Sequence, residues 1–175
     1  MASKISPWGG TNTVRRATDE DVPAITALIN RAYRVEEFFV EGDRTDEQQV
    51  RAVCRDGFFL VLDAAIADGT PAVDGVLAGS VYVQIKGDRG YFGLLSVAPE
   101  LQGCGVGARM VGVAEALCQA EGCSVMDLQV VNLRTELPPW YRSLGYEDNG
   151  TAPFPISPPP KQPCHFIRMS KHLDS

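Results

Sequence analysis

The 175-residue sequence lacks the features that mark several large protein classes. No stretch reaches the roughly 18 apolar residues of a membrane-spanning helix, and residues 1–14 have no basic segment followed by an apolar core, as a secretory signal would. The five cysteines form no Cys-x-x-Cys pair, and the two histidines have no partners at metal-ligand spacing. We therefore expect a cytoplasmic protein with reduced thiols, no metal site and no membrane association.

Positive charge is also scarce, because 16 Lys and Arg residues face 22 Asp and Glu residues, for a net charge of -6. A protein that binds nucleic acid broadly needs a basic face, so we expect no nucleic-acid partner. The acidic balance weakly favours a basic or amine substrate. The length suits a single domain over residues 1–175, with residues 1–12 as a loose N-terminal arm.

The apolar periodicity and the turn residues predict helices and strands that mix without strict alternation. This favours an α/β (mixed α+β) fold with a mixed sheet. Capping boxes at Thr18 and Thr45 predict two helix starts, the second helix ending near Arg55. The predicted strands are 13–17, 58–63, 76–85, 91–97, 124–131, 146–148 and 164–173; later helices are 106–121 and 138–144, and turns or loops are 68–71 and 150–163.

The most informative segment is Gln102–Gly107, which lies between the predicted strand 91–97 and the predicted helix 106–121. Glycines let the backbone approach an anion closely, and free N–H groups at a helix start point at it. The segment lacks the Lys-Ser/Thr ending of a Walker loop, and its glycine spacing fits the dinucleotide fingerprint poorly. A Gln-x-x-Gly-x-Gly pattern remains, which predicts a phosphorylated cofactor.

The stretch Leu94–Met110 closely resembles the acetyl-CoA-binding motif of the GNAT family, the Gcn5-related N-acetyltransferases. Residues 141–146 (Tyr-Arg-Ser-Leu-Gly-Tyr) resemble the second motif of that family, an aromatic-rich helix that ends in Gly-Tyr or Gly-Phe. The order of elements agrees over residues 13–173. The resemblance implies a GNAT-like acyl-CoA N-acyltransferase fold, with a mostly antiparallel sheet of about six or seven strands flanked by about four helices. It also implies that strands 91–97 and 124–131 diverge near their C-terminal ends.

Acetyl-CoA, the implied donor, would bind mainly to backbone groups. Its pantetheine arm would pair like an added strand with the strand that ends at Val97. Asn132 matches a position that often bonds the arm, although a polar strand terminator is an equally good interpretation. The implied cofactor-binding residues are Leu95, Ser96, Val97, Gln102, Gly103, Cys104, Gly105, Val106, Gly107, Ala108, Asn132 and Tyr141.

Two catalytic groups follow from the same resemblance. Tyr141 matches the tyrosine that lies near the cofactor sulfur and protonates the departing thiolate, and the backbone N–H of Val97 would polarise the thioester carbonyl. The general base stays open, because strand 91–97 carries no glutamate. The candidates are Glu36, Glu37, Asp127, Glu136 and a water relay.

The acceptor is expected between residues 33–42 and the loop 150–163, where Tyr33, Glu36 and Phe38, with Phe39, would form an aromatic and partly acidic wall. Such a wall suits a small-molecule primary amine that attacks the acetyl group directly. The predicted function is therefore acetyl-CoA-dependent N-acetylation. A non-catalytic acyl-CoA-binding sensor or regulatory module and a nucleotide-dependent oxidoreductase remain alternatives. The last strands would support a homodimer.

Overall fold

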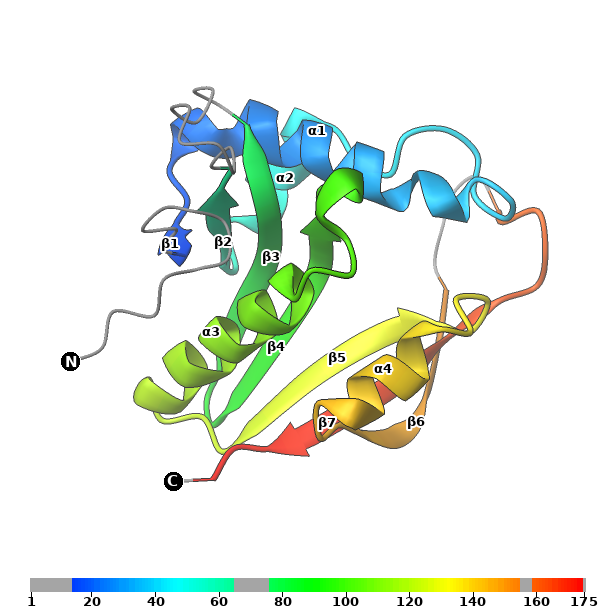
Figure 1. Ribbon diagram of the computed structural model, residues 1–175. Coiled ribbons are helices and arrows are strands. Elements are labelled where there is room, and N and C mark those ends of the chain that lie inside the picture. Colours follow the sequence, from blue (N-terminus) through cyan, green and yellow to red (C-terminus); the bar gives the residue numbers. More distant parts are fainter. Residues whose placement is uncertain (1–13, 65–75, 155–158, 175) are drawn as a thin grey trace.

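The computed structural model describes residues 14–64, 76–154 and 159–174. In these residues the chain forms one seven-stranded sheet in the order β1-β2-β3-β4-β5-β7-β6 (Figure 1). Neighbouring strands run antiparallel except for β4 and β5, which are parallel. The predicted arm 1–12 and turn 68–71 lie outside the described residues. The strands are β1 (Val14–Arg16), β2 (Phe58–Asp63), β3 (Leu77–Lys86), β4 (Arg89–Val97), β5 (Val125–Val131), β6 (Glu147–Pro153) and β7 (His165–His172).

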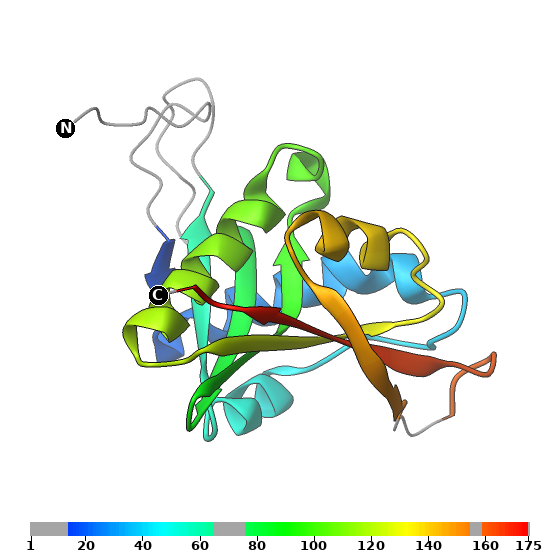
Figure 2. The same ribbon diagram turned by 90° about the horizontal axis from the view of Figure 1, so that it is seen from below.

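Helices cover both faces of the sheet, so the fold is the expected mixed α/β arrangement (Figure 2). On one face, α1 (Val22–Ala32) and α2 (Glu47–Val53) pack their apolar residues against β2 and β3. On the other face, α3 (Val106–Ala120) and α4 (Leu137–Ser143) pack against the central strands. Within the described residues, no helix is long and apolar enough to cross a bilayer.

The two predicted helix starts differ in outcome. At the first, the Asp21 carboxylate accepts a hydrogen bond of 2.8 Å from the Thr18 backbone N–H, as a capping box requires. At the second, the prediction of Thr45 as the cap is wrong, because Asp46 accepts from the Gln49 N–H instead. Thr45 is buried, and its backbone exchanges two hydrogen bonds of 3.0 Å with the side-chain amide of Asn30.

Strand β6 extends into the segment predicted to be a loop from residue 150 onward, so that prediction is wrong for residues 150–153. Among the residues that the structure describes, the strand pairs only with β7, and its register shifts between Asp148 and Thr151 around Gly150, which has a φ of 102°. An edge strand with one pairing partner leaves most of its side chains in solvent. Such a strand has no apolar alternation by which its sequence would be recognised.

The two central strands β4 and β5 separate along their length, as expected (Figure 1). Their pairing covers Arg89 to Tyr91 on β4 and stops at the pair Tyr91 and Asp127. Beyond this pair, β4 has β3 as its only strand partner in the described part of the chain, and their register shifts at Leu94, whose φ is 50°. A bulge of this kind bends a strand. The sheet therefore opens at its centre.

Candidate active site

Two cavities flank the opening between β4 and β5. The first, here the glycine-turn cavity, has a volume of about 450 Å³ and is lined by residues 102–103 and 105–108 together with parts of α4. The second, here the inner cavity, has a volume of about 110 Å³ and lies between the separated strands. The residues that line both cavities are Tyr33, Leu95, Leu137 and Tyr141.

The glycine turn presents backbone to the first cavity. Gly103 and Gly105 have φ values of 78° and 85°, which other residues rarely adopt. At both positions a Cβ would meet no heavy atom within 4 Å, so the space beside the backbone is open. Helix α3 starts here with no side-chain cap, so the N–H groups of its first turn have no partner within the helix. This arrangement is a ready anion site.

The free edge of β4 continues from the glycine turn into the sheet. The Ala98 N–H bonds the Ala78 carbonyl on the β3 side, at 2.9 Å. Because backbone groups alternate along a strand, the N–H groups of Val97 and Leu95 point to the opposite edge, where β5 has moved away. Within the described segments, the Val97 carbonyl on that edge accepts only a 3.4 Å contact from the Gln102 side chain. An extended molecule could therefore pair with this edge.

Tyr141 on α4 stands where the two cavities meet. Its ring is 7% exposed and packs against Phe92, Trp140 and Tyr146. Within the described part of the chain its hydroxyl has no hydrogen-bond partner. Burial raises the pKa of Tyr141, so the phenol keeps its proton through neutral pH. A neutral hydroxyl with no internal partner can donate a proton or a hydrogen bond to a bound molecule.

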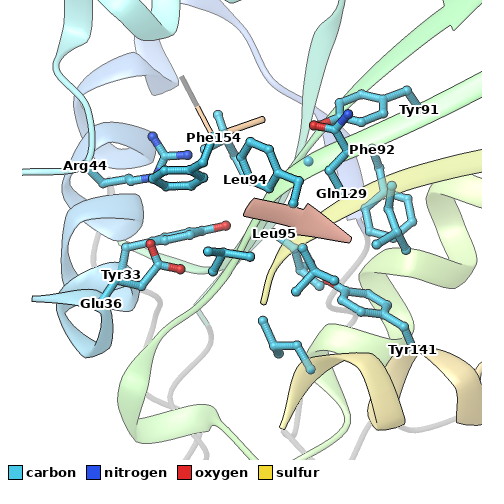
Figure 3. Close-up of a pocket in the computed structure, with 16 residues that line it drawn as sticks. Tyr33, Glu36, Arg44, Tyr91, Phe92, Leu94, Leu95, Gln129, Tyr141 and Phe154 are labelled. Carbon is cyan, nitrogen blue, oxygen red and sulfur yellow. The ribbon is translucent and has the colours of Figure 1, made fainter. Parts of the chain in front are cut away.

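The inner cavity has a more polar wall on the side of α1 and the short helix η2 (Tyr33–Glu36) (Figure 3). Glu36 is only 5% exposed, and burial raises the pKa of its carboxyl group against the opposing influence of Arg44 and Arg134. Burial likewise raises the pKa of Tyr33 to about 12. Tyr91 and Gln129 complete the polar lining from the two central strands.

A chain of charges joins the two cavities. The Arg134 guanidinium lies 3.3 Å from a Glu36 oxygen and 2.6 Å from a Glu136 oxygen. Arg134 and Glu136 line the glycine-turn cavity, whereas Glu36 lines the inner cavity. Glu36 is therefore held close to the boundary between them, with its charge partly compensated.

The structure brings together many of the residues predicted from the sequence. Tyr33, Leu95 and Tyr141 line both cavities, and Glu36 lines the inner one. The glycine-turn cavity is also lined by Val97, Gln102, Gly103, Gly105, Val106, Gly107 and Ala108.

Four predicted residues are placed elsewhere. Phe38 is 49% exposed and lines neither cavity, while the neighbouring Phe39 is fully buried. The Asn132 side-chain oxygen accepts a 2.9 Å bond from the His165 N–H, so it closes the end of β7. Buried Ser96 bonds the Leu94 carbonyl through its hydroxyl. The exposed thiol of Cys104 contacts the Gln102 carbonyl at 3.7 Å.

The structure also separates the candidate bases. Asp127 lies in the part of β5 that is still paired with β4, forms a two-bond ion pair with Arg89 and lines neither cavity. Glu37 is exposed, and so is Glu136. Glu36 alone among the four candidates is buried and lines the inner cavity.

Sequence reasoning missed four polar residues of the site: Arg44, Tyr91, Gln129 and Arg134. Gln129 could have been found, because it lies on the less apolar face of the predicted strand 124–131. Arg44 and Arg134 lie in connecting segments without periodicity, and only the folded chain shows that their side chains reach the cavities.

The sequence model of the Acetyltransferase (GNAT) family matches residues 23–146 of the chain, which include the glycine turn, Glu36 and Tyr141. The chain belongs to the GNAT acetyltransferase family. A comparison with curated protein sequences finds no match.

Solved structures of GNAT acetyltransferases share the fold. The ribosomal-protein-S18-alanine N-acetyltransferase of Escherichia coli is 16% identical, with 94% of this chain and 96% of that one covered and a TM-score of 0.70. Nourseothricin acetyltransferase is 21% identical, with coverages of 94% and 100% and a TM-score of 0.71. The putative acetyltransferase yncA of Salmonella typhimurium, solved with acetyl-CoA, is 20% identical, with coverages of 95% and 96% and a TM-score of 0.67.

Proposed function

We propose that this protein is a single-domain, acetyl-CoA-dependent N-acetyltransferase that transfers the acetyl group directly to the primary amine of a small molecule. The observation that carries this proposal is the junction of the two cavities. At that junction Tyr141 lines both the glycine-turn cavity and the inner cavity, and a buried carboxylate, Glu36, lines the inner cavity. A donor in the first cavity would therefore meet an acceptor in the second beside a proton donor and a proton acceptor.

The residues of the glycine-turn cavity fit acetyl-CoA. The uncapped first turn of α3 and the open glycines suit the pyrophosphate, and the free edge of β4 at Leu95 and Val97 suits the amide groups of the pantetheine arm. When bound, the cofactor supplies an acetyl group as a thioester. The structure of yncA, a protein of similar fold that was solved with acetyl-CoA, supports the choice of this cofactor.

The chain's own groups then have separate roles. The Val97 N–H, fixed in β4, donates a hydrogen bond to the acetyl oxygen and stabilises the charge that develops there. Glu36, directly or through a water, accepts the proton that the attacking amine loses. Tyr141, kept neutral by burial, donates its proton to the departing sulfur. The proton gained by Glu36 and the one lost by Tyr141 balance over the reaction.

The similar structures support acyl transfer without choosing an acceptor. One is named for an alanine of a ribosomal protein and another for nourseothricin, two very different amines. The inner cavity, with a volume of about 110 Å³, favours a small molecule.

Calorimetry combined with an assay for released CoA thiol tests the proposal. We expect the protein to bind CoA but not NAD, and to release CoA thiol from acetyl-CoA faster when an acceptable amine is added. Binding of NAD without CoA would support the oxidoreductase alternative. Tight CoA binding without thiol release, over a broad set of amines, would leave the sensor alternative.

A further inference from the structure

Arg44 is the arginine that lines the inner cavity, and the proposed reaction gives it no role. Its side chain lines the cavity, and its guanidinium carbon lies 5.5 Å from the centre of the Tyr33 ring. Its Nε atom is buried and has no hydrogen-bond partner within residues 14–64, 76–154 and 159–174. A buried donor without an acceptor is costly, and native proteins leave few of them. The unpaired donor therefore points to an acceptor that a ligand supplies.

The charge of Arg44 is also uncompensated by any direct contact. The second arginine near the cavity, Arg134, already has two carboxylate partners, Glu36 and Glu136. Among the described residues, no ion pair or hydrogen bond joins Arg44 to an acid; its charge only opposes the rise in the pKa of Glu36. The cavity wall thus holds a cation that is ready to receive an anion.

The position of Arg44 sets the orientation of such a ligand. Arg44 lines the inner cavity but not the glycine-turn cavity, whereas Tyr141 lies at the junction of the two. In Figure 3 the two side chains lie at opposite ends of the cavity, with Glu36 and Tyr33 on the wall near Arg44. A molecule that spans the cavity would place its anionic group at Arg44 and its amine at the end where acetyl transfer is proposed.

We infer that the acceptor is a small amino carboxylate, such as a free amino acid, whose carboxylate is bound by Arg44. This inference rests on the proposed function, because it assigns the inner cavity to the acceptor. A guanidinium matches the two oxygens of a carboxylate and forms strong charge-assisted bonds with it. The neutral carbonyl of a peptide would satisfy the donor but leave the charge uncompensated, and a cavity of about 110 Å³ offers little room for a longer chain.

The test compares matched acceptors that differ only at the carboxyl end. Free amino acids are assayed beside their carboxamides, beside the amines that lack the carboxyl group, and beside short peptides. The readouts are kcat/KM from CoA thiol release and calorimetric binding to the protein saturated with CoA. The variants are Arg44→Gln and Arg44→Lys, with Arg51→Gln as the control, because Arg51 is an exposed arginine of α2 that lines neither cavity.

We expect the wild type to prefer a free amino acid over its carboxamide by roughly 10- to 100-fold, the effect of one charge-assisted pair. Arg44→Gln should remove this preference by lowering activity on the acid and not on the amide. Arg44→Lys should keep part of the preference, and Arg51→Gln should keep all of it. If Arg44→Gln lowers kcat/KM equally for the free amino acid and its carboxamide, Arg44 only supports the fold and the inference is wrong.

The remaining outcomes separate this inference from the proposed function. If amides, simple amines or peptides are acetylated at the same rate as free amino acids, the proposed activity stands. The inference that Arg44 binds an acceptor carboxylate is then wrong. If free amino acids bind in a way that depends on Arg44 but are not acetylated, the carboxylate site is confirmed and the proposed acetyltransferase activity is wrong. If no free amino acid binds to the CoA-loaded protein or reacts, the carboxylate site is wrong.

Discussion

The two cavities that meet at Tyr141 are built in different ways. The glycine-turn cavity takes its largest share of lining residues from one continuous segment, residues 101–108, which presents backbone groups. The inner cavity takes side chains from η2, the segment before α2, both central strands and α4, and also from Phe154, just after β6, and Phe166 on β7. A backbone site depends on local conformation, whereas a side-chain site depends on the packing of distant elements. The first should tolerate most side-chain changes, and the second should not.

The comparison is tested most strongly at Tyr141, which belongs to both cavities. Tyr141→Phe removes the proposed proton donor and should lower kcat by about 100-fold, while the affinity for CoA changes little because the ring still fills its place. Steady-state kinetics and calorimetry measure the two effects. Tyr82→Phe is the matched control, since the Tyr82 hydroxyl bonds the Val53 carbonyl away from both cavities. Equal turnover in the wild type and Tyr141→Phe would reduce Tyr141 to a packing residue.

The next largest effect on turnover is expected at Glu36, which lines the inner cavity. Glu36 must be ionised to accept a proton, and burial raises its pKa, so turnover should rise with pH through a value above that of an ordinary glutamate. Glu36→Gln should remove this acid limb from the pH profile and lower kcat by about 10- to 100-fold.

Exposed Glu37 offers the control, and Glu37→Gln should leave the profile unchanged. If the acid limb survives in Glu36→Gln, the limb belongs to another group, such as the acceptor amine. Glu36 in the inner cavity would then not be the general base.

The smallest of the three effects is expected in the glycine-turn cavity. Gly105→Val places a branched residue at a φ of 85° and should weaken CoA binding about tenfold. Gly112→Ala on α3 is the control, since a Cβ there meets nothing within 4 Å. That control should raise stability by about 0.5–1 kcal/mol without affecting CoA. Calorimetry gives the affinities and thermal unfolding the stability. Unchanged affinity in Gly105→Val would show that this turn does not hold the cofactor.

The fold was largely predictable because its elements carry strong local patterns. Strand β2 is predicted from Phe58 to Asp63 and found there, and α3 is predicted to within one residue. Both bury a regular apolar set that the sequence displays. The polar edge strand β6 was missed from residue 150 onward, because pairing with β7 alone makes it a strand.

The residues of the candidate active site also differ in whether local sequence patterns predict them. The glycine turn and Tyr141 belong to short continuous motifs, so their positions follow from the sequence. Glu36 could be named only as one of four candidate bases, since its burial depends on how η2 packs against the sheet. Arg44 could not be named at all, because its importance comes from a missing partner, and a missing partner is visible only in three dimensions.

The early end of the pairing between β4 and β5 has a consequence for stability. Among the described residues, strand pairing between the two halves of the sheet covers residues 89–91 and 125–127, and one further main-chain bond joins the Ser124 N–H to the Asp88 carbonyl. The rest of the junction depends on side chains. A molecule bound as an added strand along β4 would supply hydrogen bonds that the chain itself omits. Its binding free energy would then add to the free energy of unfolding, so the donor substrate would also act as a structural part of the fold.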